Sequence, residues 1–289
     1  MFQQISILGP GLLGASLALA MKERGLCQRV HSWSRRAETR LQAMQADWCD
    51  AVFDQASSAC EASDLVVVCT PVETIIPLIE QVTPSLSPEA LVTDVGSIKG
   101  LICREAQSLK VNFIGSHPMA GSERTGMAHA SHNLFDGAAC FITPLDGDSD
   151  AEIAQLQQLW QAIGMRVVST TPEKHDEIVA HISHLPHLLA SSLCAHLARM
   201  DANWKSLAGG GLRDTTRAAA GDPTLWKQIL EQNREEALRA IDGFENELQA
   251  LKGALLDKNT PCLLYTSPSP RDRQKSPMPG CALKKEGRG

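Results

Sequence analysis

The chain is poor in aromatic residues and in cysteine motifs. Phe, Trp and Tyr together make up 4% of its 289 residues, and Tyr265 is the single tyrosine. Mechanisms that need a catalytic tyrosine, such as that of the short-chain dehydrogenases, are therefore not expected. The nine cysteines include no C-x-x-C pair, and several lie in apolar runs such as VVVCT at 66–70. This usage predicts reduced, mostly buried thiols, and it predicts neither a disulfide scaffold nor a metal site.

The chain also lacks an excess of positive charge and a long apolar run. Its net charge is −6, so no electrostatic basis for nucleic-acid or anionic-membrane binding is visible. No run is long and apolar enough to predict a bilayer span. The apolar N-terminal stretch 1–21 has no basic region before it, which argues against a signal peptide. We therefore expect a cytoplasmic protein with no membrane and no nucleic-acid partner.

Short apolar segments alternate with helical patterns over residues 1–170, the first predicted domain. Their continuous Val, Ile and Leu runs indicate strands that are buried on both faces. Strand–helix alternation then predicts an α/β fold with a doubly wound, mostly parallel sheet. Predicted strands are 4–8, 29–33, 64–70, 90–95, 112–117, 140–143 and 166–170, and predicted helices include 12–24, 73–83 and 151–163.

The pattern becomes helical from residue 171 and predicts an all-α second domain at 171–260. Within it we expect a proline interruption at Pro186 and one long helix at 223–258. A helical domain of this size has a limited core, so we expect it to bury an apolar face against a second copy in a homodimer. Residues 261–289 are rich in Pro, Ser and basic residues, which predicts disorder. This tail also resembles a sequencing-adaptor read-through, so we treat it as non-native.

A glycine motif follows the first predicted strand and opens the first predicted helix. Gly9, Gly11 and Gly14 form G-x-G-x-x-G. The first glycine permits the turn, the second lets a pyrophosphate approach the backbone, and the third lets helix and strand pack closely. The predicted cofactor-binding loop of this Rossmann-type domain comprises Gly9, Gly11, Leu12, Leu13 and Gly14.

The residues that follow the second strand favour NADP over NAD. An NAD site normally has a carboxylate about twenty residues after the glycines, whereas this chain has Ser34, Arg35 and Arg36. A hydroxyl and guanidinium groups bind a 2′-phosphate that a carboxylate would repel. The alternative is that the two arginines are a solvated helix start. Thr70 and Pro71 close another strand at the cofactor edge, where they either border the cofactor or form a simple strand-to-helix turn.

A histidine ends the predicted strand 112–117. Pro118 disfavours the α region for His117 and holds it extended, which restricts where the imidazole points. With an unperturbed pKa near neutrality, an imidazole can accept a proton from a hydroxyl. His117 is therefore the predicted general base, and its alternative is a structural histidine.

Several longer segments carry a family resemblance. GPGLLGASLA, CTPVE, TDVGSIKG, GSHPMAGSERTG, ISHLPHLLA and GGGLRDTTRAAAGDPTLW occur in this order across residues 1–260. In them the chain resembles the prephenate/arogenate dehydrogenases of tyrosine biosynthesis. The resemblance implies a Rossmann domain followed by a helical dimerisation domain. It also implies NAD(P)-dependent oxidative decarboxylation of prephenate and/or arogenate, giving 4-hydroxyphenylpyruvate and/or tyrosine.

The resemblance also implies roles for individual residues. His117 would take or share the proton of the ring hydroxyl, with Ser97 close to that hydroxyl and the nicotinamide. Arg217 would bind a substrate carboxylate, and His187 would line the substrate pocket. Weaker assignments to the substrate site are Arg213, Glu123 and Trp226. The alternatives for Arg213 and Glu123 are a structural role and an exposed loop position. By resemblance Trp226 would reach the site across a dimer interface, and its alternative is a buried core aromatic. His175 has no partner pattern and is assigned a structural role.

Two other functions remain open at this point. A β-hydroxyacid dehydrogenase has the same two-domain plan but generally uses a lysine on the first helix of the second domain. Here that helix offers histidines, and Lys174 lies near its start. A non-catalytic NADP-binding module would keep the glycine loop but would not need His117 and Arg217 together.

Overall fold

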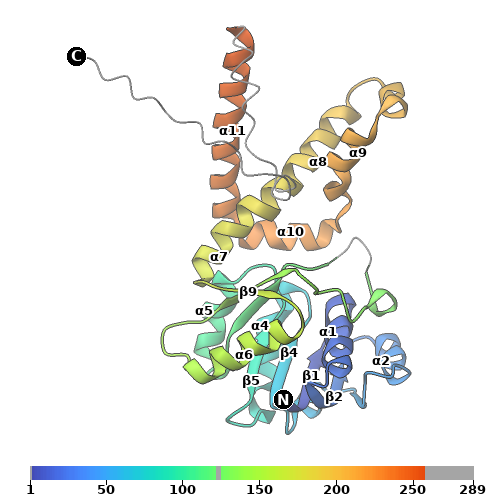
Figure 1. Ribbon diagram of the computed structural model, residues 1–289, viewed down its shortest axis with the longest axis vertical. Helices are drawn as coiled ribbons and strands as arrows, with labels where there is room; N and C mark the ends of the chain where they lie inside the picture. Colours follow the sequence, from blue (N-terminus) through green and yellow to red (C-terminus); the bar gives the residue numbers. More distant parts are fainter. Residues whose placement is uncertain (1, 122–124, 258–289) are drawn as a thin grey trace, which may run out of the picture. The chain divides into compact units, whose positions relative to one another are not determined.

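The computed structural model describes residues 2–121 and 125–257. Contacts within the chain divide it into two compact units, Met1–Ala240 and Ile241–Gly289. Figure 1 shows the order of the elements along the chain. The predictions for Glu123 and for the tail 261–289 lie outside the described residues.

A parallel sheet forms the centre of the first unit. Its six strands have the order β3-β2-β1-β4-β5-β6, which reverses direction between β1 and β4. This is the order of a Rossmann sheet, so the predicted fold class is confirmed. The strands are β1 (Phe2–Leu8), β2 (Cys27–Trp33), β3 (Ala51–Phe53), β4 (Leu65–Val68), β5 (Leu91–Asp94) and β6 (Asn112–Phe113).

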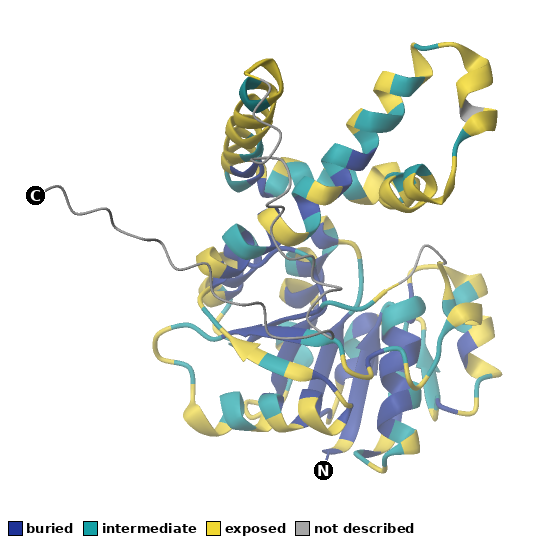
Figure 2. Ribbon diagram, turned by 45° about the horizontal axis from the view of Figure 1, so that its top comes forward, coloured by how far each residue is buried: buried dark blue, intermediate teal, exposed yellow. Residues whose placement is uncertain are grey.

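Helices cover both faces of this sheet, and each face has its own apolar core. In β4, Leu65 and Val67 belong to one core, whereas Val66 and Val68 belong to the other. All four are fully buried, which explains why this strand has a continuous apolar run. Figure 2 shows the buried residues concentrated in the sheet and in the helices beside it. These helices are α1 (Leu12–Glu23), α2 (Ala37–Met44), α3 (Ala56–Cys60), α4 (Ile75–Val82), α5 (Gly100–Ser108) and α6 (Asp150–Ala162).

The predicted strand 112–117 is wrong as a single strand. After β6 the chain leaves the large sheet and forms β7 (Gly115–Pro118), which pairs antiparallel with β8 (Ala139–Thr143). A parallel pairing of β8 with β9 (Arg166–Ser169) completes this second sheet. The separation has a local cause. The Asp94 carboxylate, at the end of β5, accepts the backbone N–H of Ser116 at 3.1 Å in place of a strand carbonyl.

Helices follow from residue 172, with two differences from the prediction. Pro186 does not interrupt the helix, because a π-helical turn, η4 (Ala180–His184), joins α7 (Pro172–Val179) to α8 (Leu185–Ala198). The predicted helix 223–258 is two helices, α10 (Pro223–Gln232) and α11 (Arg234–Leu256). They are separated at Asn233, whose backbone leaves the helical region. The remaining elements are α9 (Gly210–Thr216) and the 3₁₀ turns η1 (Val72–Thr74), η2 (Thr83–Ser85), η3 (Met127–His129), η5 (Ala202–Leu207) and η6 (Arg217–Ala220).

The helical run Pro172–Ala198 is the longest apolar element. Its 27 residues are long and apolar enough for a bilayer span by composition alone, which corrects the expectation that no run meets this criterion. Length and composition are weak grounds for a span, since a helix of a soluble protein can meet the same criterion. In α8 only His187 and Ala190 are buried, so several leucines of this helix remain partly exposed. An apolar helix with partly exposed leucines is typical of an interface between proteins.

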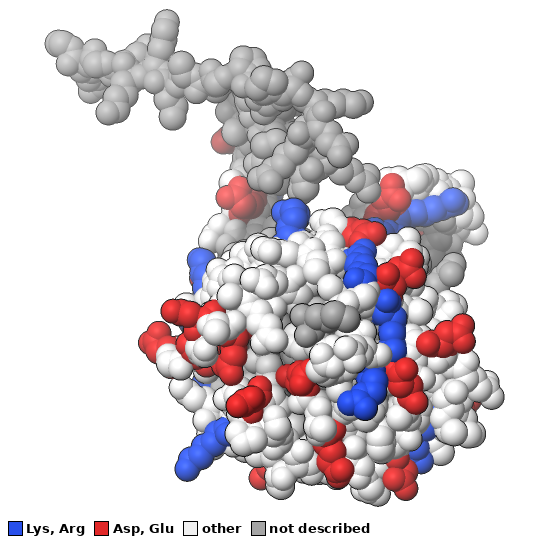
Figure 3. All heavy atoms as spheres, turned by 60° about the horizontal axis from the view of Figure 1, so that its bottom comes forward, with Lys and Arg blue, Asp and Glu red and all other residues white. Residues whose placement is uncertain are grey.

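Surface charge is mixed. Acidic and basic side chains are interspersed on the face that Figure 3 shows, in keeping with the net charge of −6.

Candidate functional site

The glycine loop leaves β1 and closes against the end of β4. Gly9 has φ +95°, and a Cβ there would lie 2.8 Å from Cγ2 of Thr70. A Cβ on Gly14 would lie 2.7 Å from the carbonyl oxygen of Gly9, so the helix could not pack as closely with any other residue. A Cβ on Gly11 would meet no atom within 4 Å. The loop is therefore tight beneath Gly9 and Gly14 and open at Gly11.

Free polar groups gather around this open side. Gly11 is the N-cap of α1 and provides no side-chain cap, so the first N–H groups of the helix face outward with the positive end of the helix dipole. The Thr70 hydroxyl oxygen is buried and has no hydrogen-bond partner in the part of the chain that the structure describes. Leu12 and Leu13, both half-buried, begin α1, and Pro71 is exposed beyond Thr70. The sheet order reverses between β1 and β4, the usual place for a ligand in such sheets. These residues fit a dinucleotide with its pyrophosphate at α1.

Hydrogen bonds from nearby side chains stabilise the loop after β2. The Ser34 side chain is 8% exposed, and its hydroxyl accepts the Arg36 backbone N–H at 3.2 Å. The Arg40 guanidinium donates to the carbonyl oxygens of Ser34 at 2.7 Å and of Arg35 at 3.2 Å. Arg35 and Arg36 are exposed. Sequence reasoning missed Arg40, because its contacts depend on the direction in which α2 leaves the loop.

A buried ion pair lies at the end of β5. Asp94 and Lys99 are both fully buried, and the Lys99 ammonium group donates to the Asp94 carboxylate. The same carboxylate accepts the N–H of Gly96 at 2.8 Å and that of Ser116 at 3.1 Å. Ser97, half-buried, is in the loop between β5 and α5. The ion pair therefore fixes both this loop and the start of β7, where the next residue is His117.

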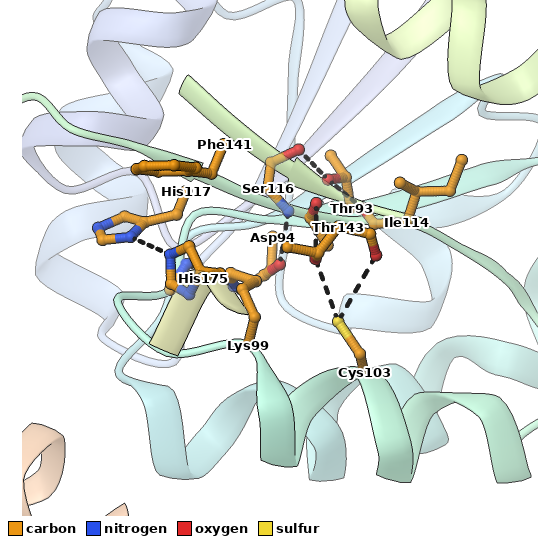
Figure 4. Close-up of polar contacts among 12 residues, drawn as sticks. Thr93, Asp94, Lys99, Cys103, Ile114, Ser116, His117, Phe141, Thr143 and His175 are labelled. Carbon is orange, nitrogen blue, oxygen red and sulfur yellow. Dashed lines mark hydrogen bonds and ion pairs between the residues drawn. The ribbon is translucent and has the colours of Figure 1, made fainter. Parts of the chain in front are cut away.

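His117 lies in β7, opposite Phe141 of β8, and is 8% exposed. Figure 4 shows its imidazole directed at that of His175, with Nδ1 of His117 2.8 Å from Nε2 of His175. Burial, together with the nearby His175, Lys99 and His184, lowers the pKa of His117 well below its ordinary value. The imidazole is therefore neutral near pH 7 and can accept a proton.

His175 is more than the structural residue expected from the sequence. It is fully buried in α7, and its Nδ1 lies 2.8 Å from Oδ1 of Asp176. Burial also lowers the pKa of His175. The only sequence signal was a histidine beside an aspartate in the polar start of a helix, which does not reveal that His117 lies opposite.

A second cluster surrounds His187 in α8. Its ring stacks on the indole of Trp226 in α10, and its Nδ1 donates to the carbonyl oxygen of Ala218 at 2.8 Å. His184 and Asn233 connect this cluster to the pair formed by His117 and His175. The Asn233 amide donates to the carbonyl oxygen of Asp176 at 2.9 Å and lies 3.3 Å from Nδ1 of His184, and the His184 ring meets Trp226 edge-on. The predicted residues His117, His187 and Trp226 are thus joined by a continuous set of contacts.

The two arginines predicted to bind substrate come shortly before Ala218 of the second cluster in the sequence. Arg213 is exposed in α9, and Arg217 is exposed in η6, immediately before Ala218. Neither forms an ion pair in residues 2–121 and 125–257. Both side chains are exposed, and a guanidinium group can bind a carboxylate through two hydrogen bonds.

Comparisons with known proteins agree on one family. A family model of the prephenate dehydrogenase nucleotide-binding domain matches residues 17–169, and one of the prephenate dehydrogenase dimerization domain matches residues 171–266. The chain is 32% identical over 256 residues to the prephenate dehydrogenase of Bacillus subtilis, covering 86% of this chain and 69% of that one. It is 31% identical over 270 residues to the cyclohexadienyl dehydrogenase of Zymomonas mobilis, covering 91% and 92%. The crystal structure of Aquifex aeolicus prephenate dehydrogenase, in complex with hydroxyphenyl propionate and NAD+, aligns with a TM-score of 0.85 at 28% identity, covering 91% of this chain and 94% of that one.

Proposed function

The chain belongs to the prephenate dehydrogenase family, and on that premise we propose that it oxidatively decarboxylates prephenate or arogenate. It is a nicotinamide-dependent oxidoreductase of tyrosine biosynthesis. The single observation that carries the proposal is the buried imidazole of His117, next in sequence to Ser116, whose backbone N–H donates to Asp94 at the end of β5. Burial lowers the pKa of His117, which favours the neutral imidazole. An imidazole in this state is a general base for a substrate hydroxyl.

The cofactor is a nicotinamide dinucleotide, and the proposal specifies NADP over NAD. Support comes from the loop that Ser34, Arg35 and Arg36 form, which offers a hydroxyl and two exposed guanidinium groups and has no carboxylate. Guanidinium groups bind a 2′-phosphate through charge-assisted hydrogen bonds. The Aquifex aeolicus relative was crystallised with NAD+, so the preference is a question for this chain's own loop. A kcat/KM with NAD well above that with NADP would refute it.

The proposed reaction gives His117 and Ser97 direct parts. A nicotinamide dinucleotide held at the glycine loop would supply the acceptor for the hydride that leaves the carbinol carbon of the cyclohexadienol. His117 takes the hydroxyl proton, so that the electrons of the O–H bond form the carbonyl. The electrons of the bond between the ring and its carboxylate then pass through the diene to the new carbonyl oxygen, which takes the proton back from His117. Carbon dioxide leaves, and the ring becomes an aromatic phenol. Ser97 is proposed to hold the hydroxyl beside His117.

The substrate carboxylates are assigned to the helical region. Arg217 binds the side-chain carboxylate, for which a permanently charged, bidentate donor is suited. His187 and Trp226 line the pocket, and Arg213 has an accessory role. In this proposal, residues 1–170 bind the dinucleotide, and residues 171–260 bind the substrate and form a homodimer. The partly exposed leucines of α8 and the match to a dimerization domain support the dimer.

The alternative functions lose their support. A β-hydroxyacid dehydrogenase would need a catalytic lysine on the first helix of the helical domain, but Lys174 is exposed there and pairs with Glu177 at 2.7 Å. A non-catalytic binding module would not account for membership of an enzyme family.

Purified protein incubated with prephenate or with arogenate, each with NADP and with NAD, tests the proposed function. Absorbance of the reduced cofactor and release of carbon dioxide are measured together. Production of both in equal amounts from at least one substrate is expected. If neither substrate reduces either cofactor, the proposed function is wrong. The variant His117→Asn is expected to lower kcat by roughly 10²- to 10⁴-fold, the usual contribution of a general base, and to retain cofactor binding.

A further inference from the structure

Both ring nitrogens of His175 are engaged inside the protein. Nδ1 lies 2.8 Å from Oδ1 of Asp176, and Nε2 lies 2.8 Å from Nδ1 of His117. The side chain is fully buried, and the Phe141 ring meets it edge-on with ring centroids 5.2 Å apart. His175 therefore has no ring nitrogen left for a substrate. Any part it plays in the reaction must pass through His117.

Asp176 determines the direction of these hydrogen bonds. Its Oδ1 accepts the backbone N–H of Lys99 at 2.8 Å, and its Oδ2 accepts that of Gly100 at 2.8 Å. These N–H groups belong to the N-terminus of α5, where a negative charge is stabilised by the helix dipole. A carboxylate in this position acts only as an acceptor. Nδ1 of His175 must consequently be the donor toward Asp176.

The remaining protons follow from the chemistry of a neutral imidazole, which has one N–H and one acceptor nitrogen. Since Nδ1 of His175 carries its proton, its Nε2 is an acceptor. Nδ1 of His117 must then carry a proton and donate it to His175. The unshared electron pair of His117 is left on Nε2, the nitrogen that does not face His175.

We propose that His175, oriented by Asp176, is a positioning residue that holds His117 in the tautomer whose Nε2 is free to accept a proton. This rests on the proposed function for the identity of the proton donor, the ring hydroxyl. As the hydroxyl O–H bond breaks and the Nε2–H bond forms, His117 becomes an imidazolium. Its Nδ1–H still donates to His175, and the Asp176 carboxylate beyond stabilises the new charge.

Nitrogen-15 NMR of the imidazole rings tests the proposal without turnover, because protonated and unprotonated ring nitrogens have well-separated shifts. Comparison with His117→Asn assigns the His117 signals. In the wild-type protein near pH 7, Nδ1 of His117 is expected to be protonated and Nε2 unprotonated. The opposite pattern would overturn the proposal. This measurement needs no variant of His175, so it decides the question even if such a variant fails to fold.

Variants of His175 separate positioning from a purely structural role. His175→Leu removes the acceptor, so His117 is expected to shift toward the Nε2–H tautomer. We expect kcat to fall roughly 10²-fold or more, with dinucleotide affinity unchanged. In His175→Gln the side-chain oxygen can occupy the position of Nε2, and we expect it to restore the His117 tautomer and most of kcat. An unchanged His117 spectrum in His175→Leu, or equal loss of kcat in both variants, would contradict the proposal.

A histidine elsewhere in the fold provides the matched control. His31 is half-buried in β2, beside Phe53, and belongs to neither cluster. His31→Leu is expected to leave the His117 signals and kcat unchanged. If the wild-type protein shows the expected tautomer but turns over neither substrate, the proposed function fails while the tautomer assignment stands. If the protein turns over a substrate but His117 has the opposite tautomer, the proposed function stands and the tautomer assignment fails.

Discussion

The imidazole of His187 lies flat against the indole of Trp226, with ring centroids 3.6 Å apart and planes 7° from parallel. Gly221 completes this arrangement, since a Cβ there would lie 2.3 Å from Nε1 of Trp226 and 3.5 Å from Cε1 of His187. The stacked pair is thus held in place by a residue that has no side chain. The position of the stacked pair therefore depends on the absence of a side chain at Gly221.

Gly221→Ala is expected to displace Trp226 and so to weaken substrate binding. KM for the substrate should rise severalfold, while KM for the dinucleotide stays constant. Overpacking of this kind usually costs about 1–3 kcal/mol of stability. Steady-state kinetics and thermal unfolding measure the two effects. Gly211→Ala is the control, because a Cβ there meets nothing within 4 Å. Equal KM values for the two variants would show that Gly221 does not position the stack.

Removing the loop guanidinium groups is expected to change cofactor preference. In Arg35→Ala/Arg36→Ala, KM for NADP should rise about tenfold or more, because two charge-assisted contacts to the 2′-phosphate are lost. KM for NAD should change little. Arg29→Ala, on an exposed position of β2, is the control for a general loss of positive charge. The NADP prediction fails if the double variant affects both cofactors alike.

Thr70→Val tests the buried hydroxyl beside the glycine loop. Within residues 2–121 and 125–257 no group pairs with this hydroxyl, so replacing it with a methyl group should leave the unliganded protein as stable as before, or more stable. If the bound dinucleotide supplies the missing partner, its affinity should fall severalfold in the variant. Thermal unfolding with and without NADP measures both effects, which have opposite signs. A variant that loses stability but keeps its affinity would show that the hydroxyl has no part in cofactor binding.

Acidification is expected to destabilise the fold through its buried histidines. Burial lowers the pKa of His117 and His175, and it lowers that of His184 from 6.5 to about 4. Between the folded and the unfolded pKa values the unfolded chain binds more protons, so stability rises with pH in that window. The stabilisation that these histidines contribute is therefore complete above about pH 6.5 and is lost progressively as the pH decreases from that value. His184 alone should account for about 2 kcal/mol between pH 7 and pH 5.

Urea unfolding at several pH values checks this expectation. His184→Gln should flatten the decline by its share, whereas His196→Gln, at an exposed position, should leave the slope as it is. A free energy of unfolding that stays constant or rises on acidification would contradict the assignment of neutral buried histidines.

Local patterns were sufficient to predict some features and not others. Apart from β3, which was not predicted, the strands of the large sheet and the glycine loop follow from short-range rules, in which apolar runs, turn residues and helix starts lie next to one another. His117 was identifiable because Pro118 and the preceding strand are its sequence neighbours. Its partner His175 lies 58 residues away, and only folding brings α7 against β7. The same holds for Asn233, whose amide donates to the backbone carbonyl of Asp176, 57 residues away.

Errors in the element boundaries have the same origin. The segment NFIGSH predicted one strand at 112–117, but the Asp94 carboxylate takes the N–H of Ser116 and the chain changes sheets. Periodicity predicted one helix over 223–258, but the side chain of Asn233 is used to hold Asp176 and His184. In both places a buried polar group outweighs local propensity, and such a group cannot be located before the tertiary contacts are known.

The π-helical turn at Ala180–His184 lets the chain take up one residue more than a regular α-helix would. One residue added to a regular α-helix rotates everything beyond it by about 100°, whereas a π-helical turn confines the extra residue to itself. The face of α8 that carries His187 therefore stays directed at Trp226. At this point of the chain an extra residue is accommodated locally, and the faces that α7 and α8 present are kept.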